Sequence, residues 1–345
     1  MLLPVRNGEA FLDEAIRSIV SQTISDWELI CIDDGSIDGT PELLRSWSLR
    51  DHRIRPIRRE PTTLVETLNA GIQHCSGTYV ARMDADDVAL PRRFEHQLAE
   101  MNRRPELDVC GGQAVIIDGR GRKRSRISVP TTPGGCQYSL ATFFTIIHPA
   151  AFFRTDTLKA FRYSPGGSEE MRLFGRLVGS GLVIGNCRET VLRYRVHGDN
   201  TNSVRSDFYE EGAVKHTEDY LKSLGIELGE EFDARAFREC VLGRFAGRQA
   251  ILSFVQALNQ LVDVVERRVK CDRREVTRLH LQNLLRIEAI LRSSDEISTL
   301  HEVQRWTDSF SKNFRNKCYV FLRRARSYLA HSKTQLPSVI SKNAR

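Results

Sequence analysis

Short apolar segments alternate with segments of helical periodicity in the first half of the chain, and this alternation constrains the fold most strongly. The apolar segments have lengths typical of buried strands, and they are residues 1–5, 27–33, 77–84 and 108–117. Between them, apolar side chains recur three and four positions apart, as on one face of a helix, in residues 11–22, 63–75 and 92–102. This order is typical of α/β folds, so we expect a mainly parallel sheet that is flanked by helices.

Acidic residues follow two of these predicted strands. Asp33 and Asp34 end one strand, and Asp84, Asp86 and Asp87 come directly after another. Ligands of open α/β sheets bind beyond the carboxyl ends of the strands. We therefore expect the two acidic groups to meet at one edge of the sheet.

The D-x-D spacing of Asp84 and Asp86 suits a hard divalent cation. Mg²⁺ and Mn²⁺ prefer oxygen ligands and commonly hold substrate phosphates as well. A cation would offset both the repulsion among the clustered carboxylates and the charge of a diphosphate leaving group. The alternative is a solvated turn without an ion. A Ca²⁺ EF-hand is excluded, because the glycine and the distal glutamate of that loop are absent.

The positive charge of the chain is concentrated at its C-terminal end. The net charge of the 345 residues is +7, yet residues 311–345 contain nine lysines and arginines and no acid. The remainder is nearly neutral, which argues against a nucleic-acid-binding body. The eight cysteines lack zinc spacing and resemble small buried side chains of a reducing, cytosolic protein. We expect neither a membrane-spanning segment nor a signal peptide.

After about residue 205 the sequence becomes helical, with apolar side chains three and four positions apart. We expect three regions, which are a catalytic region over 1–205, a helical region over 206–310 and a basic tail over 311–345. Within the tail, apolar side chains from Phe314 to Leu329 share one helical face. That face either packs on the preceding helices or lies on an anionic membrane surface.

Three segments of the chain occur in an order that resembles the inverting family-2 glycosyltransferases. They are LPVRNGEAFLDEAIRSIVSQT, WELICIDDGSIDGT and LNAGIQHCSGTYVARMDADDVALPRRFEHQ. The resemblance covers roughly residues 1–203. It implies the glycosyltransferase A-type fold, with a nucleotide-binding sheet that is followed here by a mostly α-helical C-terminal region. It also implies an enzyme that uses a nucleotide-diphosphate sugar together with Mn²⁺ or Mg²⁺.

The resemblance further implies roles for individual residues. The nucleotide sugar would be bound by Pro4, Val5, Arg6, Asn7, Asp33, Asp34, Arg82 and Asp84. The metal ligands would be Asp86, Asp84 and His197. The alternatives are an outward-pointing strand residue for Arg82 and a structural histidine for His197. Asp87 is either a partner of the metal ligands or the cap of the following helix, and we expect the cap.

A Glu-Glu pair, Glu169 and Glu170, stands where the family has a Glu-Asp pair that supplies the catalytic base. The resemblance implies that Glu170 takes the proton from an acceptor hydroxyl as it attacks the anomeric carbon, with inversion. Glu170 is one methylene longer than aspartate, and misplacement by about 1 Å can cost roughly 100-fold in rate. The alternative is an exposed pair in the first turn of a helix. His148 either lines the acceptor side or is a hydrogen-bonded core histidine.

These features predict a glycosyltransferase that acts on a glycan or lipid-linked acceptor in polysaccharide, lipopolysaccharide or other glycan synthesis. We expect a cytoplasmic protein, with peripheral contact at the inner face of the membrane through its tail. Two alternatives remain open. Arg6, in place of the family's aromatic residue, and Glu170 are compatible with an inactive sugar-nucleotide binder. The segment ICIDDGS also resembles a receiver-like signalling module, although no later lysine at a strand end supports that reading.

Overall fold

The computed structural model describes residues 1–142, 145–198, 206–229, 232–242, 244, 247–269, 273–292, 299–305 and 307. The chain divides into two compact units, of which the first holds Met1–Cys136 and Phe144–His216 and the second holds Gln137–Phe143 and Thr217–Arg345. The predicted boundaries at residues 205 and 310, and the predicted basic tail, lie outside the described residues. They stay predictions.

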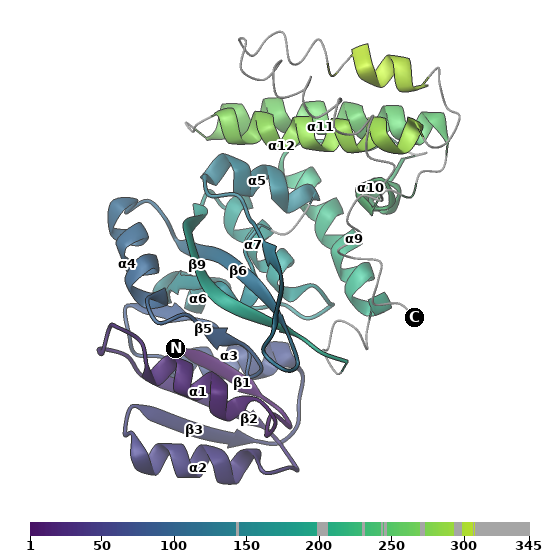
Figure 1. Cartoon of the computed structure of the whole chain (residues 1–345). Helices are drawn as coiled ribbons and strands as arrows, with labels where there is room; N and C mark the ends of the chain where they lie inside the picture. Colours follow the sequence, from purple (N-terminus) through teal and green to yellow (C-terminus); the bar gives the residue numbers. More distant parts are fainter. Residues whose placement is uncertain are drawn as a thin grey trace. The chain divides into compact units, whose positions relative to one another are not determined.

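The first unit begins with a three-stranded parallel sheet. Its strands, in order across the sheet, are β1 (Leu2–Val5), β2 (Leu29–Asp34) and β3 (Ile54–Arg59). Each is followed by a helix, and these are α1 (Leu12–Val20), α2 (Thr40–Arg50) and α3 (Leu64–His74) (Figure 1). Every residue of β1 and β2 is buried, which accounts for their nearly continuous apolar sequences. Pro56 lies in the edge strand β3, where a missing N–H disturbs the ladder least.

A second sheet in the same unit is mixed. In order across the sheet it contains β4 (Tyr79–Ala81), β8 (Phe152–Arg154), β6 (Val109–Asp118), β9 (Ile184–Val196) and β5 (Val88–Ala89), and β7 (Lys123–Ile127) pairs with β6. Of its described pairings, that of β6 with β9 is parallel and the others are antiparallel. An isolated parallel bridge joins Leu2 to Arg82. The parallel arrangement therefore holds for the first sheet, and the second adds antiparallel strands after β4.

The apolar side chains of helix α1 are buried on one face, as their spacing predicts. Leu12, Ala15, Ile16 and Ile19 are fully buried in the hydrophobic core that also contains β1 and β2. Burial of each leucine or isoleucine side chain contributes about 1.5–3 kcal/mol. Arg17 lies on the opposite, exposed side of the helix. The core of this unit thus sits between the sheet and the helix face that the sequence predicts.

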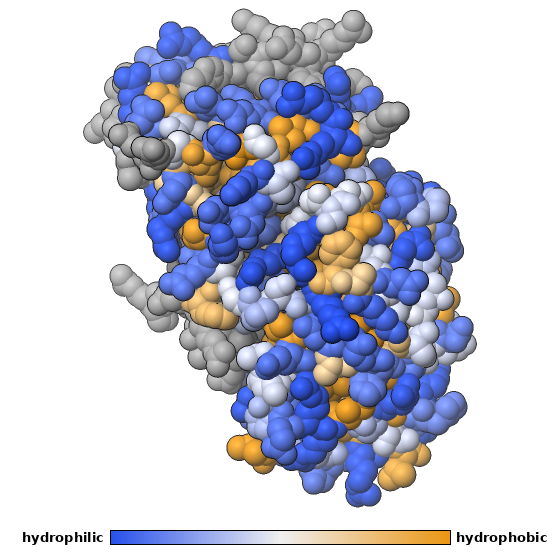
Figure 2. Space-filling model, turned by 180° about the vertical axis from the view of Figure 1, so that it is seen from behind, coloured by the Kyte–Doolittle hydropathy of each residue, from blue (hydrophilic) through white to orange (hydrophobic). Residues whose placement is uncertain are grey.

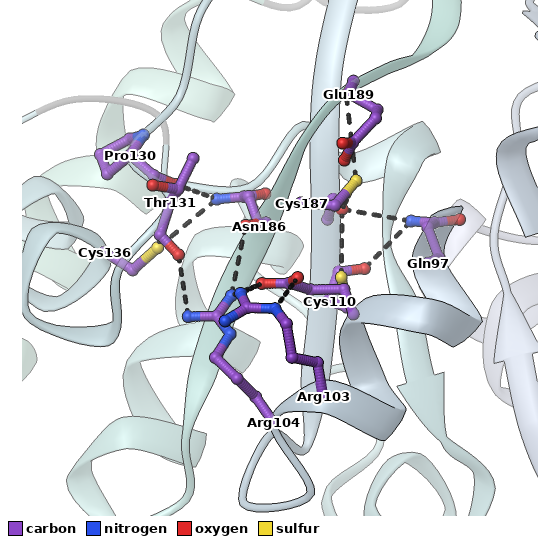
Figure 3. A network of polar contacts seen from close by, with 12 residues as sticks. Gln97, Arg103, Arg104, Cys110, Pro130, Thr131, Cys136, Asn186, Cys187 and Glu189 are labelled. Atoms are coloured by element: carbon purple, nitrogen blue, oxygen red, sulfur yellow. Dashed lines mark hydrogen bonds and ion pairs between the residues drawn. The ribbon is translucent and has the colours of Figure 1, made fainter. Parts of the chain in front are cut away.

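Side-chain amides form hydrogen bonds between the central strands of the second sheet and the segments around them (Figure 3). Asn186 of β9 donates from Nδ2 to the carbonyl oxygens of Pro130 at 2.6 Å and Thr145 at 2.8 Å. Gln97 of helix α4 (Arg93–Arg103) donates to the carbonyl oxygen of Cys110 in β6 at 3.1 Å. Both amides are buried, so loss of either side chain would leave carbonyl groups unsatisfied.

The remaining named helices lie between strands of the second sheet along the sequence or follow its last strand, β9. They are α5 (Pro133–Thr142), α6 (Thr155–Phe161), α7 (Glu169–Gly179), α9 (Ser206–Ser223), α10 (Ala234–Leu242), α11 (Arg248–Arg268) and α12 (Arg273–Arg292), with the short 3-10 helix η1 at His148–Ala150. The mostly helical C-terminal region is confirmed, and α11 packs against α12 (Figure 1). Within the described ranges, no helix has both the length and the apolar character that a bilayer crossing requires.

The surface seen in Figure 2 is mostly hydrophilic, and its apolar residues form separate small groups. The six cysteines in the described part of the chain are buried and form no disulfide. They serve as small core side chains, as their scattered positions predict.

Candidate active site

The D-x-D segment forms the turn between β4 and β5. Carboxylate oxygens of Asp84, Asp86 and Asp87 lie within 4.8 Å of one another. Asp84 and Asp86 are partly exposed, whereas Asp87 is buried. Burial, and then the charge of Asp84, raise the pKa of Asp86 and, more strongly, the pKa of Asp87. Three carboxyl groups held this close favour a cation among them, which would lower these pKa values.

Strand β9 brings His197 to this turn. His197 Nε2 lies 3.0 Å from Asp86 Oδ2, and its ring packs on Phe11, with 4.9 Å between the ring centroids. Imidazole nitrogens and carboxylate oxygens both ligate divalent first-row metals. Of the residues predicted as metal ligands, Asp86 therefore lies close to both Asp84 and His197.

Asp87 does not cap the following helix, so that prediction is wrong. Helix α4 begins only at Arg93. Asp87 Oδ1 instead accepts a 2.7 Å hydrogen bond from the backbone N–H of Arg195 in β9. The physical reason is the short strand β5, which follows Asp87 directly and pairs with β9.

Arg195 is a residue of this site that the sequence analysis missed. Its side chain is 2% exposed and donates from Nε to the carbonyl oxygen of Asp86 at 2.7 Å and from Nη2 to Glu14 Oε2 at 2.6 Å. The guanidinium also lies over the ring of Phe11, 4.7 Å from its centroid. Arg195 thus fixes the acidic turn relative to the start of helix α1. Its one sequence signal is its position, two residues before the predicted metal ligand His197.

Arg82 is buried, with 3% side-chain exposure, so the outward-pointing alternative is wrong. Its Nη1 donates to Asp84 Oδ2 at 2.6 Å, and its Nη2 lies 2.5 Å from Asp84 Oδ1. Such a bidentate pair fixes the position of both side chains. Burial raises the pKa of Glu169 and Glu170, and the positive charge of Arg82 offsets part of that rise. Arg82 therefore interacts both with the acidic turn and with the Glu169–Glu170 pair.

Glu169, Glu170 and His148 form a separate cluster, with one ligand atom of each within 4.8 Å of the others. Both glutamates lie in the first turn of α7, after Ser168 with its positive φ of 45°. Glu169 is 5% exposed, so the alternative of an exposed first-turn pair is wrong for this residue. Burial, and then the charge of Glu169, raise the pKa of Glu170 to about 7. A carboxyl group with this pKa is suited to proton transfer near neutral pH.

His148 lies beside the glutamates, as a residue lining the acceptor side would, and it is also hydrogen-bonded, as a core histidine would be. Its Nε2 lies 2.9 Å from the hydroxyl of Tyr163. Burial lowers the pKa of His148 well below its usual value, so the imidazole is neutral. Tyr163, which the sequence analysis did not single out, orients the ring beside the glutamates.

The loops after β1 and β2 are tied to each other. Asn7, with a positive φ of 52°, donates its backbone N–H to Ser36 Oγ and accepts from the backbone N–H of Ile37, both at 2.9 Å. Asp33 Oδ1 accepts from the backbone N–H of Ser36 at 2.9 Å. These bonds hold the predicted donor-binding residues Asn7 and Asp33 in one small region.

The other predicted donor-binding residues adjoin this region. Asp34 Oδ1 accepts from the hydroxyls of Thr62 and Thr67, both at 2.9 Å. The half-exposed Arg6 extends toward it, with 3.9 Å between Arg6 Nη1 and Asp34 Oδ2. Pro4 and Val5 are themselves buried within β1, and the side chain of Val5 belongs to the core.

The β1 loop reaches the acidic turn through Gly8. A Cβ on Gly8 would lie 3.7 Å from Ala85 Cβ, between the two aspartates of the D-x-D segment. Two loops from the first sheet and the acidic turn therefore border one another, as the carboxyl ends of neighbouring strands should.

The site thus combines two loops beside a strand-end acidic turn with the Glu169–Glu170 pair, a set of groups that could bind a metal-chelated phosphate and accept a proton. Residues 1–163 match the family model described as "Glycosyl transferase family 2". The chain is 32% identical over 206 residues to EpsE of Bacillus subtilis (strain 168), whose name assigns it provisionally as a glycosyltransferase, and the match covers 58% of this chain and 73% of EpsE. It is 28% identical to the O-antigen biosynthesis glycosyltransferase WbnJ of Escherichia coli, over 61% of this chain and 84% of WbnJ.

The chain belongs to glycosyl transferase family 2, and it is a glycosyltransferase. The resemblance seen in the sequence is confirmed, and the receiver-like alternative is wrong.

Two solved structures share the fold across most of the chain. Staphylococcus aureus TarS 1–349 in complex with UDP-GlcNAc has a TM-score of 0.50 at 15% identity, covering 90% of this chain and 91% of that one. Mannosyltransferase PcManGT from Pyrobaculum calidifontis, in complex with GDP-Man and Mn²⁺, has a TM-score of 0.51 at 14% identity, covering 96% and 87%. The expected glycosyltransferase A-type fold is thereby confirmed.

Proposed function

We propose that this glycosyltransferase moves a sugar from a nucleotide-diphosphate sugar to an acceptor hydroxyl, with inversion and with the help of a divalent metal ion. The observation that carries the proposal is the arrangement of charge around Arg82. Its guanidinium binds both oxygens of Asp84 in the acidic turn, and its charge offsets part of the rise that burial causes in the pKa of Glu169 and Glu170. A donor-binding carboxylate and a proton-accepting carboxyl pair that both interact with the guanidinium of Arg82 suit a displacement at a sugar carbon.

Asp86 and His197, with Asp84, would hold Mn²⁺ or Mg²⁺. Carboxylate oxygens and one imidazole nitrogen within a few ångströms form a donor set that these ions accept. When bound, the ion supplies positive charge to the diphosphate of the departing nucleotide. The solved structure of PcManGT contains Mn²⁺ together with GDP-Man, which supports a divalent cofactor.

Pro4, Val5, Arg6, Asn7, Asp33 and Asp34 would form the nucleotide end of the donor site, next to Arg82 and Asp84. The exposed side chain of Arg6 can stack on the base in place of an aromatic ring. The TarS and PcManGT structures contain UDP-GlcNAc and GDP-Man respectively, so relatives of this fold use different nucleotides. For this chain we propose a nucleotide-diphosphate sugar without choosing the base.

Glu170 would accept the proton of the acceptor hydroxyl as the oxygen attacks the anomeric carbon. Its pKa of about 7 allows a substantial carboxylate population at neutral pH together with appreciable basicity. Attack from the side opposite to the leaving nucleotide inverts the configuration of the sugar. Glu169 and the neutral His148 would position the base and the acceptor.

The acceptor class proposed is a growing glycan or a lipid-linked saccharide in polysaccharide or lipopolysaccharide synthesis. The name of the relative WbnJ refers to O-antigen biosynthesis, which supports this class. We place the reaction in the cytoplasm, at the inner face of the membrane.

The test is a thermal-shift screen of UDP-, GDP- and dTDP-sugars with and without Mn²⁺, followed by product detection with the stabilising donor. The expected result is that one nucleotide sugar stabilises the wild-type protein only with metal, and that Asp86→Ala abolishes this. Asp26→Ala, at an exposed carboxylate outside the site, is the matched control and should behave as wild type. Equal stabilisation of Asp86→Ala would remove Asp86 from the metal site. Donor binding without turnover on any acceptor would favour the inactive binder.

A further inference from the structure

The turn after β6 and the strand β7 carry concentrated positive charge outside the residues discussed so far. Every residue from Gly119 to Arg126 is exposed. Five of these eight residues are basic and none is acidic, and the basic residues are Arg120, Arg122, Lys123, Arg124 and Arg126. Residues 119–126 are called the basic hairpin below.

The surrounding protein offsets only part of this charge. Asp118, at the base of the basic hairpin, pairs with Arg122 at 3.0 Å and with Arg124 at 2.6 Å. The two arginine side chains nevertheless remain 62% and 56% exposed. Arg126 donates to the neutral Thr190 Oγ1 at 3.1 Å. One carboxylate therefore faces five cations, and most of their donors point to solvent.

The charge forms an extended array. In the described sheet, β7 pairs with β6 and lies at the edge. The register aligns Arg126 with Val115, and Val115 in turn with Arg193 of β9. Directly paired residues point to the same face, and the exposed Arg193 lies two strands, or about 10 Å, from Arg126. Such a surface suits many anionic groups side by side better than it suits one small anion.

The basic hairpin begins beside the proposed metal site. Arg195 Nη1 donates to the carbonyl oxygens of Asp118 at 3.3 Å and Gly119 at 3.4 Å. A Cβ on Gly119 would lie 3.7 Å from the Cβ of His197. A surface that binds the basic hairpin would therefore be held close to the acidic turn.

We propose that the basic hairpin docks on an anionic membrane leaflet and so holds the active site at the lipid headgroups. Charge complementarity carries this choice, because a leaflet presents phosphate groups in a two-dimensional array that matches an edge strand with charges along its length. Four of the five cations are arginines, whose guanidinium groups bind phosphate through two parallel hydrogen bonds. Docking needs no sugar transfer, so the inference holds or fails independently of the proposed function.

The test compares full-length wild type with Lys123→Gln/Arg124→Gln/Arg126→Gln by sedimentation with vesicles. The vesicles contain phosphatidylglycerol in phosphatidylcholine, or phosphatidylcholine alone. Each Lys or Arg beside an anionic leaflet strengthens binding about fivefold, so the variant should bind anionic vesicles about 100-fold more weakly at low salt. Wild-type protein should not sediment with the neutral vesicles, and its binding to the anionic vesicles should weaken as the salt concentration is raised.

A matched control removes the same charge elsewhere. Arg45→Gln/Arg267→Gln/Arg278→Gln changes three exposed arginines, one of which is ion-paired, as Arg124 is. This control should bind anionic vesicles within about threefold of wild type, since its arginines are not assigned to the leaflet contact. All variants should keep the wild-type melting midpoint.

Two results would overturn the inference. If the hairpin variant binds vesicles as well as the control variant does, another part of the chain supplies the contact. If soluble polyphosphate binds wild type as tightly as vesicles do at equal phosphate concentration, the ligand is a soluble polyanion instead.

Discussion

Replacing Glu170 with glutamine should make the protein more stable and inactive at the same time. The pKa of Glu170 is raised from 4.5 to about 7, first by burial and then by the charge of Glu169. An acid whose pKa is raised in the folded state destabilises that state once it ionises, so the cost is small at low pH and complete above pH 7. Glutamine keeps a similar shape and never ionises.

The size of the effect follows from the shift. Relative to Glu170→Gln, wild type should lose about 1 kcal/mol of unfolding free energy at pH 5 and about 3 kcal/mol at pH 8. Activity should show the opposite dependence, because a base must be ionised to accept a proton. The wild-type kcat should fall about tenfold for each pH unit below pH 7 and level off above about pH 8.

The assays are urea denaturation of both proteins at pH 5 and pH 8, and the kcat–pH profile of wild type. Titrations of groups that do not interact with Glu170 cancel in the comparison, and any change at Glu169, whose charge acts on Glu170, is part of the measured difference. A glutamine variant that is less stable than wild type at pH 8 would refute the conclusion that the ionised Glu170 destabilises the folded state. A wild-type kcat that stays constant from pH 6 to pH 8 would refute Glu170 as the base.

Three further substitutions test the structural supports of the site. Arg195→Lys removes part of the guanidinium contacts to Asp86 and Glu14, so the Mn²⁺ concentration for half-maximal activity should rise about tenfold, measured by metal titration with the melting midpoint as the folding check. Asn186→Ala removes two buried hydrogen bonds and should lower the unfolding free energy by about 2–4 kcal/mol, measured by denaturant titration. Gly212→Ala would place a Cβ 2.4 Å from the backbone of Gly167, which lies directly before Ser168 and Glu169. Because the resulting shift would displace the Glu169–Glu170 pair, we expect at least about a tenfold loss of kcat. Gly229→Ala, with open space around it, should keep wild-type kcat.

The sequence predicted those parts of the fold that depend on local periodicity. The buried face of α1 and the two fully buried strands β1 and β2 follow directly from the spacing of apolar residues. The acidic turn was found as a short segment with an unusual density of charge, whereas the Glu169–Glu170 pair was found through the family resemblance. Local pattern is sufficient wherever the physical cause lies within one turn of helix or one strand.

The failures share a different cause, which is pairing between distant segments. Asp87 was expected to cap the next helix, but its partner is Arg195, 108 residues later in the chain. The role of Arg195 could not be read from its neighbours, because its contacts come from helix α1 and the acidic turn. Arg82 is likewise buried by groups that converge only in the folded chain. For such residues the register of β5 against β9 is the missing information.

The Arg82–Asp84 pair also distinguishes the roles of the two aspartates in the D-x-D segment. Both oxygens of Asp84 face the guanidinium, so much of the hydrogen-bonding capacity of this carboxylate is already used. The side chain of Asp86 meets His197, and its carbonyl oxygen meets Arg195. A cation in the turn could therefore be ligated by Asp86 and His197 while Arg82 stays paired with Asp84. We therefore propose Asp86 as the principal metal ligand, whereas Asp84 would hold the guanidinium of Arg82 in place.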